Sequence, residues 1–255
     1  MHEKLCKTDK IENGIVILTI PGSSAIPARQ LLEALQHQIA AFVGNGCIKG
    51  IILTGTEYGF CRCLAGVPFA PSEASALAGF GQHVMFSLEK TGKPCIAAVA
   101  GECTGLGLEL ALACDFIVAS GRASFGFPGI AYGNIPFCGG TQRLARLVGK
   151  SKAKELVFSG ELIDAGEALR IRLINRLYDD HDLIPEAHGL LSHICTRSPN
   201  AIRIGCEVIN AGYDIDLQTA CMLERDAFAF CFSSFDQREG MQAFLDKRQP
   251  QFKGD

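Results

Sequence analysis

A glycine-rich turn followed by a lone carboxylate is the feature of this sequence that could do chemistry. An apolar run at 95–100 is typical of a buried strand, and a helical pattern follows at 108–114, apolar except for Glu109. The turn between them carries three glycines: Gly101, Gly105 and Gly107. A helix that starts directly after such a turn leaves backbone N–H groups unpaired at its positive end. That arrangement suits an anion, or an oxygen that becomes anionic during a reaction.

The spacing of Leu106 and Glu109 indicates how the turn could work. Residues three apart lie on one face of a helix start, so a backbone donor at Leu106 and the Glu109 carboxylate could face one small volume. One would hold a developing negative charge and the other would move a proton. A turn built only for tight packing, with a glutamate that finds a buried partner, fits the composition equally well. A nucleotide loop does not fit, because no Gly-Lys-Ser/Thr follows.

Composition narrows the class of protein. The chain has 255 residues, 48% hydrophobic content and a net charge of −3, with no Lys/Arg cluster, so nucleic-acid binding is not expected. No apolar run reaches the roughly 18 residues of a membrane span, and the N-terminus is too polar for a signal peptide, which predicts a cytoplasmic protein. The 12 cysteines lack C-x-x-C spacing and are interpreted as reduced, mostly buried thiols, and no metal site is expected.

The order of the elements predicts an α/β fold with a helical C-terminal part. Strands are expected at 15–20, 48–54, 95–100, 115–119, 123–127 and 173–177, and helices at 29–43, 73–90, 108–114, 141–148, 150–159 and 164–170. Strand–helix–strand order favours crossovers and parallel pairing. From about residue 182 only helical patterns follow, at 183–195, 201–211, 217–232 and 237–247. Two parts are therefore expected, 1–181 and 182–255.

Three long segments resemble the crotonase superfamily, which comprises the enoyl-CoA hydratases and isomerases. They are KPCIAAVAGECTGLGLELALACDFIVAS, ASFGFPGIAYGNIPFCGGTQRLARLVGKSKAKELVFSGELIDAGEALRIRLIN and DQREGMQAFLDKRQPQF. The resemblance runs over nearly the whole chain in order. It implies an α/β spiral of ββα units, C-terminal helices that form homotrimers or hexamers made of two trimers, and an acyl-CoA thioester substrate. No cofactor is implied apart from the coenzyme A of the substrate, and an acyl carrier protein remains an alternative carrier.

The resemblance also implies an oxyanion hole made of two backbone N–H groups, which would stabilise an enolate. One donor corresponds to Leu106, next to Gly105, where most members have a further glycine. The other falls in Phe60-Cys61-Arg62-Cys63-Leu64-Ala65, where members usually read Phe-Ser-Ala-Gly-Ala-Asp, and corresponds to Arg62. The flanking Cys61 and Cys63 are expected to contact the substrate. Cys63 replaces a glycine, which alters the loop.

The hydratases of this superfamily use two glutamates, of which this chain retains one. The first corresponds to Glu109, whereas the second belongs to a Phe-Gly-x-Pro-Glu motif that reads Phe-Gly-Phe-Pro here and ends in Gly129. Weak or absent hydratase activity on simple enoyl-CoA is therefore predicted. Tyr132 is expected to line the acyl pocket, unless it only packs. Phe244 and Lys247 match the segment that meets the CoA adenine and phosphates, often across a subunit boundary, although a solvated helix end is the alternative.

Two hypotheses follow. In the first, the protein is an acyl-CoA lyase or isomerase that uses Glu109 as its single acid/base and the N–H groups of Arg62 and Leu106 as its oxyanion hole. In the second, it is a non-catalytic or divergent relative that binds acyl-CoA or an acyl carrier without hydratase activity. The departures at Gly129 and Cys63 and the altered segment at 21–26 favour the second.

Overall fold

Two β-sheets form the centre of the protein in the computed structural model, which describes residues 5–8, 12–22, 26–62 and 70–255. The larger sheet has the strand order β1-β2-β3-β4-β6-β9, and the smaller has the order β5-β7-β8. The strands of the larger sheet are β1 (Lys7–Thr8), β2 (Ile15–Thr19), β3 (Gly50–Thr54), β4 (Cys95–Val99), β6 (Phe116–Ser120) and β9 (Arg176–Tyr178). Those of the smaller sheet are β5 (Glu102–Thr104), β7 (Ser124–Gly126) and β8 (Ile163–Asp164).

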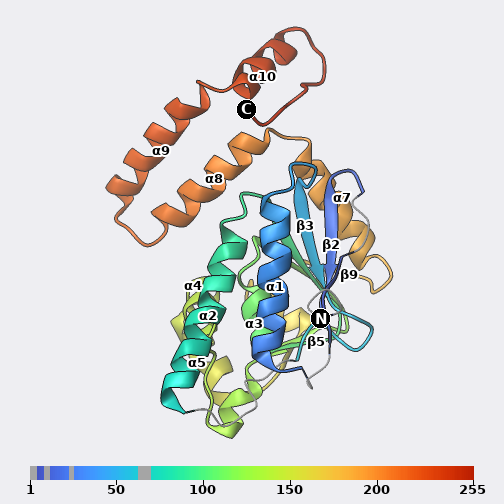
Figure 1. Cartoon of the computed structure of the whole chain (residues 1–255), viewed down its shortest axis with the longest axis vertical. Helices are drawn as coiled ribbons and strands as arrows, with labels where there is room; N and C mark the ends of the chain where they lie inside the picture. The colour runs from blue at the N-terminus through green and yellow to red at the C-terminus, as the bar shows by residue number, and fades with distance from the viewer. Residues whose placement is uncertain (1–4, 9–11, 23–25, 63–69) are drawn as a thin grey trace.

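Helices cover these sheets and connect their strands (Figure 1). In chain order they are α1 (Ala28–Val43), α2 (Pro71–Glu89), α3 (Leu106–Ala111), the 3-10 helix η2 (Pro128–Tyr132), α4 (Gly140–Val148), α5 (Lys150–Ser159), α6 (Ala165–Arg170), α7 (Leu183–Cys195), α8 (Pro199–Gly212), α9 (Leu217–Cys231) and α10 (Phe235–Leu245). From β2 to β9 the pairs of the larger sheet are parallel, which confirms the expected crossovers.

The chain steps repeatedly from one sheet to the other. β4 belongs to the larger sheet, the next strand β5 to the smaller one, and α3 follows; β6 and β7 repeat the step before η2 and α4. Each ββα unit therefore ends where a short strand of the smaller sheet gives way to a helix. This step sets the glycine-rich turn at the junction of the two sheets.

The strand β4 shows why the sequence around it is apolar without alternation. Its side chains Cys95, Ala97 and Val99 belong to the main core, whereas Ile96 and Ala98 belong to a second core that includes residues of α7. A strand covered on both faces requires a continuous apolar run, as parallel sheets generally do.

Two expected elements lie elsewhere than predicted. The helix expected at 108–114 runs from Leu106 to Ala111, so it starts two residues nearer to the turn. The strand expected at 173–177 is β9, three residues further on, because the N–H of Leu173 closes the end of α6 by donating to the Ala168 carbonyl (2.8 Å). Leu173 is apolar because it is buried in the core without pairing in a strand.

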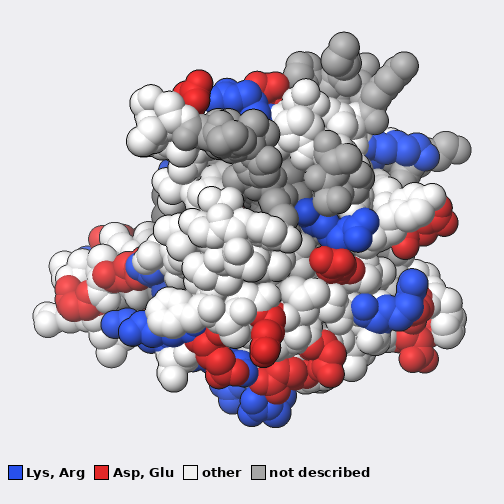
Figure 2. Space-filling model, turned by 90° about the horizontal axis from the view of Figure 1, so that it is seen from below, with Lys and Arg blue, Asp and Glu red and all other residues white. Residues whose placement is uncertain are grey.

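The described residues on the face shown in Figure 2 form no patch of a single charge. Figure 2 shows Lys and Arg beside Asp and Glu around a largely uncharged centre of that face. No helix in this part of the chain is both long and apolar enough to cross a membrane. The described cysteines are free thiols, as expected. The expectation that most of them are buried is wrong, because five are buried, four are half-buried, and Cys47 and Cys221 are exposed.

The C-terminal helices divide into one that packs on the core and three that project from it. Helix α7 covers the larger sheet through Leu183, Ala187 and Leu191. Helices α8–α10, called the arm below, extend beyond the sheets, with α8 and α9 side by side (Figure 1). The arm exposes large apolar side chains: Ile209, Tyr213, Leu217, Met222, Leu223, Phe228, Phe230, Phe232, Phe244 and Leu245.

A buried carboxylate ties the C-terminal tail to the arm. Asp236 is 1% exposed and accepts hydrogen bonds from the Ser198 hydroxyl (2.6 Å) and from the backbone N–H groups of Lys253 (2.7 Å) and Gly254 (3.1 Å). Its removal would leave the hydroxyl of Ser198, the N-cap of α8, and two backbone N–H groups of the tail without this acceptor.

Replacing Asp236 by alanine is expected to lower the free energy of unfolding by about 2–3 kcal/mol, because hydrogen bonds to a charged group are lost from a buried site. Urea unfolding at one protomer concentration measures this loss, and limited proteolysis should cut residues 249–255 faster. The exposed Asp226, paired with its neighbour Arg225, provides the matched control, whose alanine variant should change stability by less than about 1 kcal/mol. Equal effects of the two variants would contradict the role given to Asp236.

Candidate active site

The backbone around Cys61 lies against the glycine-rich turn. Cys61 pairs with Cys103 in a parallel bridge, its carbonyl accepts from Thr104 N–H (3.0 Å), and its N–H donates to the Glu102 carbonyl (3.3 Å). A Cβ placed on Gly107 would lie 2.3 Å from the Cys61 carbonyl oxygen, so only glycine permits this approach. The segment after β3 and the first turn of α3 are therefore in direct contact.

The two N–H groups expected to form an oxyanion hole belong to these contacting segments. Leu106 is the first residue of α3, and Gly105 precedes it with a φ of 55°, a conformation that glycine favours. Arg62 follows Cys61 directly. Within the described residues, neither the Leu106 nor the Arg62 backbone N–H donates a hydrogen bond. Both are therefore available to an acceptor. Cys63 lies outside the described residues.

The Arg62 side chain is engaged in contacts of its own. Its Nε donates to the carbonyl of Gly22 (3.2 Å), and its Nη1 lies 3.6 Å from Glu102 Oε2. The guanidinium therefore holds the segment after β3 against β5. The group of Arg62 that is left for an acceptor in the site is its backbone N–H.

Glu109 is buried beneath the turn and is held by backbone donors. The residue is 1% exposed, and its Oε1 accepts from the N–H groups of Cys138 (2.6 Å) and Gly140 (2.8 Å). A Cβ on Gly140 would lie 2.8 Å from Glu109 Cγ and 2.9 Å from Oε1, so a side chain at 140 would displace the carboxylate. No ion pair joins Glu109 to another described residue within salt-bridge distance.

Burial shifts the proton affinity of this carboxyl group. Desolvation raises the pKa of Glu109 from its ordinary 4.5 to about 7, and this effect outweighs the opposing ones. The backbone N–H groups that bind Oε1 and the guanidinium of Arg143 act in the opposite direction and lower the pKa. A carboxyl group with a pKa near neutrality can both accept and donate a proton at physiological pH.

The 3-10 helix η2 carries the position where the second glutamate of hydratases was expected. Gly129 lies in its first turn, and a Cβ there would meet only Asn134, at 3.7 Å from its Cβ and 3.8 Å from its carbonyl oxygen. The backbone at Gly129 thus has room for a side chain. Tyr132 ends the same helix and is 74% exposed, so its ring projects from the surface of the chain.

Phe244 and Lys247 lie far from Glu109 in the chain as folded. Phe244 is near the end of α10 and is 77% exposed, and Lys247 follows the helix with a φ of 55°. Figure 1 shows α10 on the arm, well apart from α3. The fold of one chain does not bring these two residues to the carboxylate.

Sequence reasoning missed the residues that hold Glu109. Cys138 and Gly140 lie 29 and 31 positions beyond it and belong to the turn that precedes α4. The signal available was the pair Gly139-Gly140, directly before the helix expected at 141–148. Gly139 has a φ of 101°, and its successor admits no side chain beside the carboxylate.

A metal centre has no support in this region. Among the described residues, no three His, Cys, Asp or Glu side chains are grouped so that they could hold a metal ion. Asp115, directly before β6, accepts from the Cys95 N–H (2.7 Å), which joins the starts of β4 and β6.

Comparison with known proteins places these features in a family. The profile of the enoyl-CoA hydratase/isomerase family matches residues 11–255. A crotonyl-CoA hydratase of Syntrophomonas wolfei is 36% identical over 249 residues, which cover 94% of this chain and 95% of that protein. A short-chain-enoyl-CoA hydratase of Clostridium acetobutylicum is 36% identical over 245 residues, or 93% of each chain.

Solved structures agree with the sequence comparison. An enoyl-CoA hydratase of Bacillus anthracis superposes with a TM-score of 0.90 at 31% identity, over 98% of this chain and all of that one. A Geobacillus kaustophilus structure, described as an enoyl-CoA hydratase subunit, gives a TM-score of 0.91 at 33% identity and 98% coverage of both. The two sheets, the ββα steps and the C-terminal helices are thus those of the crotonase fold, and the chain belongs to the enoyl-CoA hydratase/isomerase family.

Proposed function

We propose that this protein moves a proton next to the carbonyl of an acyl-CoA thioester, as a double-bond isomerase or a lyase. Glu109 is its single acid/base. The backbone N–H groups of Arg62 and Leu106 hold the thioester oxygen while an enolate forms. Gly105 and Cys61 shape the wall around that oxygen.

The burial of the Glu109 carboxyl group, held by two backbone N–H groups, is the observation that carries this proposal. Removal of a proton from the carbon next to a thioester needs a base that works near neutral pH, and its return to another carbon needs the conjugate acid. A carboxyl group with a pKa of about 7 serves in both roles. Isomerisation needs only this one group, because the proton taken from Cα is given back at Cγ.

Hydration is served by two carboxylates in the corresponding hydratases, whereas this site has one. Water must be activated at one carbon while a proton is delivered to the neighbouring carbon, and the corresponding hydratases divide the work between two glutamates. Gly129 offers no carboxylate at the second position. The relatives named as hydratases therefore identify the family, whereas the loss of this group favours a reaction with one proton-transferring residue.

The arm supplies a reason to expect assembly of several copies. Its α9 has no buried residue, and large apolar side chains are exposed along α8–α10, which is unusual for the surface of an isolated chain. We infer that other copies of this chain cover these side chains in a homotrimer, or in a hexamer of two trimers. Phe244 and Lys247 would then meet the coenzyme A bound to a neighbouring copy.

Solvent exchange with a β,γ-unsaturated thioester tests the proposal directly. Wild-type protein incubated with 3-butenoyl-CoA in deuterated water should convert this thioester to its conjugated isomer. The product should carry deuterium. Mass spectrometry and the absorbance of the conjugated product report the two events. Calorimetry with CoA and acetyl-CoA measures binding separately.

The outcomes separate the two hypotheses. Exchange with conversion supports an enolate-forming enzyme. Binding of CoA without exchange, across thioesters of different chain length, would instead identify a non-catalytic acyl-CoA-binding relative. If the protein shows no binding of CoA and no exchange, both hypotheses about the site are overturned.

A further inference from the structure

The turn at residues 138–140, called the holding turn below, determines where the Glu109 carboxylate lies. Two of its backbone N–H groups, those of Cys138 and Gly140, donate to Glu109 Oε1 at 2.6 and 2.8 Å. The turn has a left-handed residue at its middle, Gly139, and its last residue, Gly140, is the first residue of α4. The N–H of Cys138 lies outside that helix, so a contact beyond the carboxylate is needed to keep it pointing the same way as the N–H of Gly140.

Arg143 also contacts the holding turn. Its Nη1 donates to the carbonyl of Cys138 (3.0 Å), the residue whose N–H binds the carboxylate. A Cβ on Gly139 would lie 2.1 Å from the same Nη1, so the guanidinium lies directly against the turn. The hydrogen bond and the close contact together fix the peptide units of the turn.

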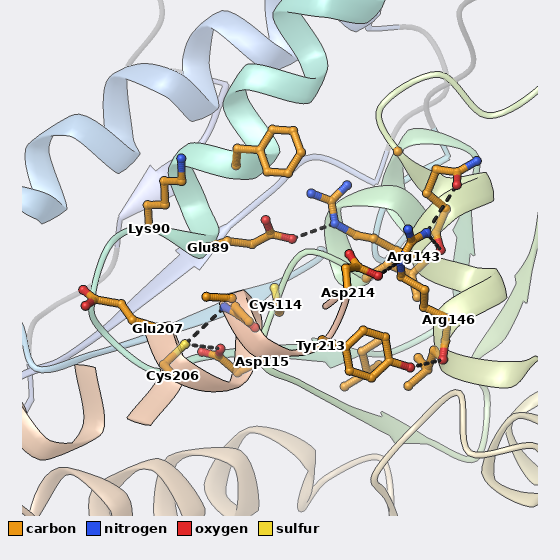
Figure 3. A pocket seen from close by; sticks show the side chains of 18 of the residues that line it. Glu89, Lys90, Cys114, Asp115, Arg143, Arg146, Cys206, Glu207, Tyr213 and Asp214 are labelled. Carbon is orange, nitrogen blue, oxygen red and sulfur yellow. Dashed lines mark hydrogen bonds and ion pairs between the residues drawn. The ribbon is translucent and has the colours of Figure 1, made fainter. Parts of the chain in front are cut away.

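Arg143 is itself anchored by helix α2. Its Nε donates to Glu89 Oε1 (2.7 Å), and its guanidinium carbon lies 5.1 Å from the centre of the Phe86 ring. The side chains of Arg143 and Glu89 are 15% and 27% exposed, so solvent screens the pair only in part. Both line a pocket of about 1000 Å³ between α2, α4 and α8, and Figure 3 shows Glu89 pointing toward Arg143 across it.

We propose that Arg143, anchored by Glu89, is a positioning residue for Glu109: it locks the holding turn and thereby the two N–H groups that orient the carboxylate. The inference rests on the proposed function for its catalytic meaning, because Glu109 is the acid/base there. Arg143 touches no reacting atom and acts through the backbone of the turn.

The charge of Arg143 gives the arrangement a second consequence. Its guanidinium lowers the pKa of Glu109 and so opposes the effect of burial. The other charged groups around α3 have partners of their own: Glu102 of β5 pairs with Arg62, Arg146 of α4 pairs with Asp214, and Glu89 of α2 pairs with Arg143. Asp115, which follows α3 and lines the same pocket, accepts from the backbone N–H of Cys95. Removal of Arg143 should therefore change both the geometry and the proton affinity of Glu109.

The test replaces Arg143 by glutamine and by lysine, with Arg146→Gln as the matched control. Arg146 lies on the same helix and the same pocket wall, and its Nε donates to the exposed Asp214 (3.0 Å) rather than to the holding turn. Infrared difference spectra against Glu109→Gln isolate the protonated carboxyl band of Glu109. Titration of that band gives its pKa without any substrate.

We expect Arg143→Gln to raise the pKa of Glu109, because the guanidinium is one of the groups that lower it. Exchange at pH 6 should then fall, since below the pKa the ionised fraction falls about tenfold for each unit by which the pKa rises. Arg143→Lys should restore most of the wild-type pKa of Glu109 but less of the exchange rate. Lysine keeps the charge, but it cannot contact both Glu89 and the Cys138 carbonyl as the guanidinium does. Arg146→Gln should match wild type in both.

An unchanged carboxyl pKa in Arg143→Gln, or an equal shift in Arg146→Gln, would overturn the inference. If Arg143→Gln does not fold, Glu89→Gln releases the anchor while keeping the guanidinium, and the exchange rate should still drop. A wild-type rate in Glu89→Gln would then count against the role. If Glu109→Gln leaves the activity intact, the proposed function fails, yet the infrared titration still decides whether Arg143 positions Glu109.

Discussion

Replacing Glu109 by glutamine is expected to slow thioester proton exchange by about 10²–10⁴-fold, the usual contribution of general acid–base catalysis. Glutamine can still accept the two N–H groups of the holding turn through its amide oxygen, so the backbone around it should stay in place. Because the loss is one of proton transfer, binding of CoA should remain at the wild-type level. Exchange rates and calorimetry on the same preparations measure the two properties.

The pH dependence of the wild type gives the same assignment an independent check. The base form is the ionised carboxylate, so with a pKa of about 7 the exchange rate should rise about tenfold per unit below pH 7 and level off above it. Glu109→Asp keeps an acid but shortens the side chain, and should retain a pH-dependent remnant. A profile that is flat from pH 5 to 8, or a glutamine variant as fast as wild type, would remove Glu109 from the mechanism.

Introducing a glutamate at Gly129 should convert the protein towards a hydratase. The family resemblance places the second carboxylate at this position, and a Cβ there meets nothing closer than 3.7 Å, so the backbone can carry the side chain. With two carboxylates, one can activate water while the other delivers the proton. Hydration of crotonyl-CoA is therefore expected to rise by about 10²-fold or more.

Gly129→Gln is the matched control for this gain. It has the same length and shape but no acid or base, so it should hydrate crotonyl-CoA no faster than wild type. The double variant Gly129→Glu with Glu109→Gln should also lack the gain, because a single carboxylate is again present. Equal hydration rates for the glutamate and glutamine variants would show that the missing second group does not limit this chain. A wild-type rate comparable to that of ordinary hydratases would lead to the same conclusion.

The fold could be predicted where one local signal dominates. Helices at 150–159 and 183–195 have the expected bounds, because their apolar spacing and flanking residues agree. The strands at 15–20 and 95–100 were evident from apolar runs without alternation. β9 was misplaced because Leu173 is apolar for a different reason, namely burial in the turn after α6. Periodicity reports burial, and it cannot tell a paired strand from a buried turn.

Only the part of the candidate site that lies within one short segment of the sequence could be predicted. The strand–glycine–helix order around Leu106 and Glu109 is local, so the sequence indicates it directly. A segment about thirty residues away supplies the N–H donors of Cys138 and Gly140 and the contact from Arg143. Whether these groups reach Glu109 and its turn depends on how α4 packs on α3. Hydropathy and spacing carry no information on that approach.

Because main-chain N–H groups hold Glu109, positions 138 and 140 differ in the substitutions that they tolerate. Every residue type except proline presents the same N–H, so the hydrogen bond from position 138 does not depend on the side chain there. That side chain is constrained separately, because Cys138 is buried and its thiol lies against Gly81. Position 140 admits no side chain at all, because it would collide with the carboxylate being held. The position of the Glu109 carboxylate thus depends on a glycine far downstream in the chain.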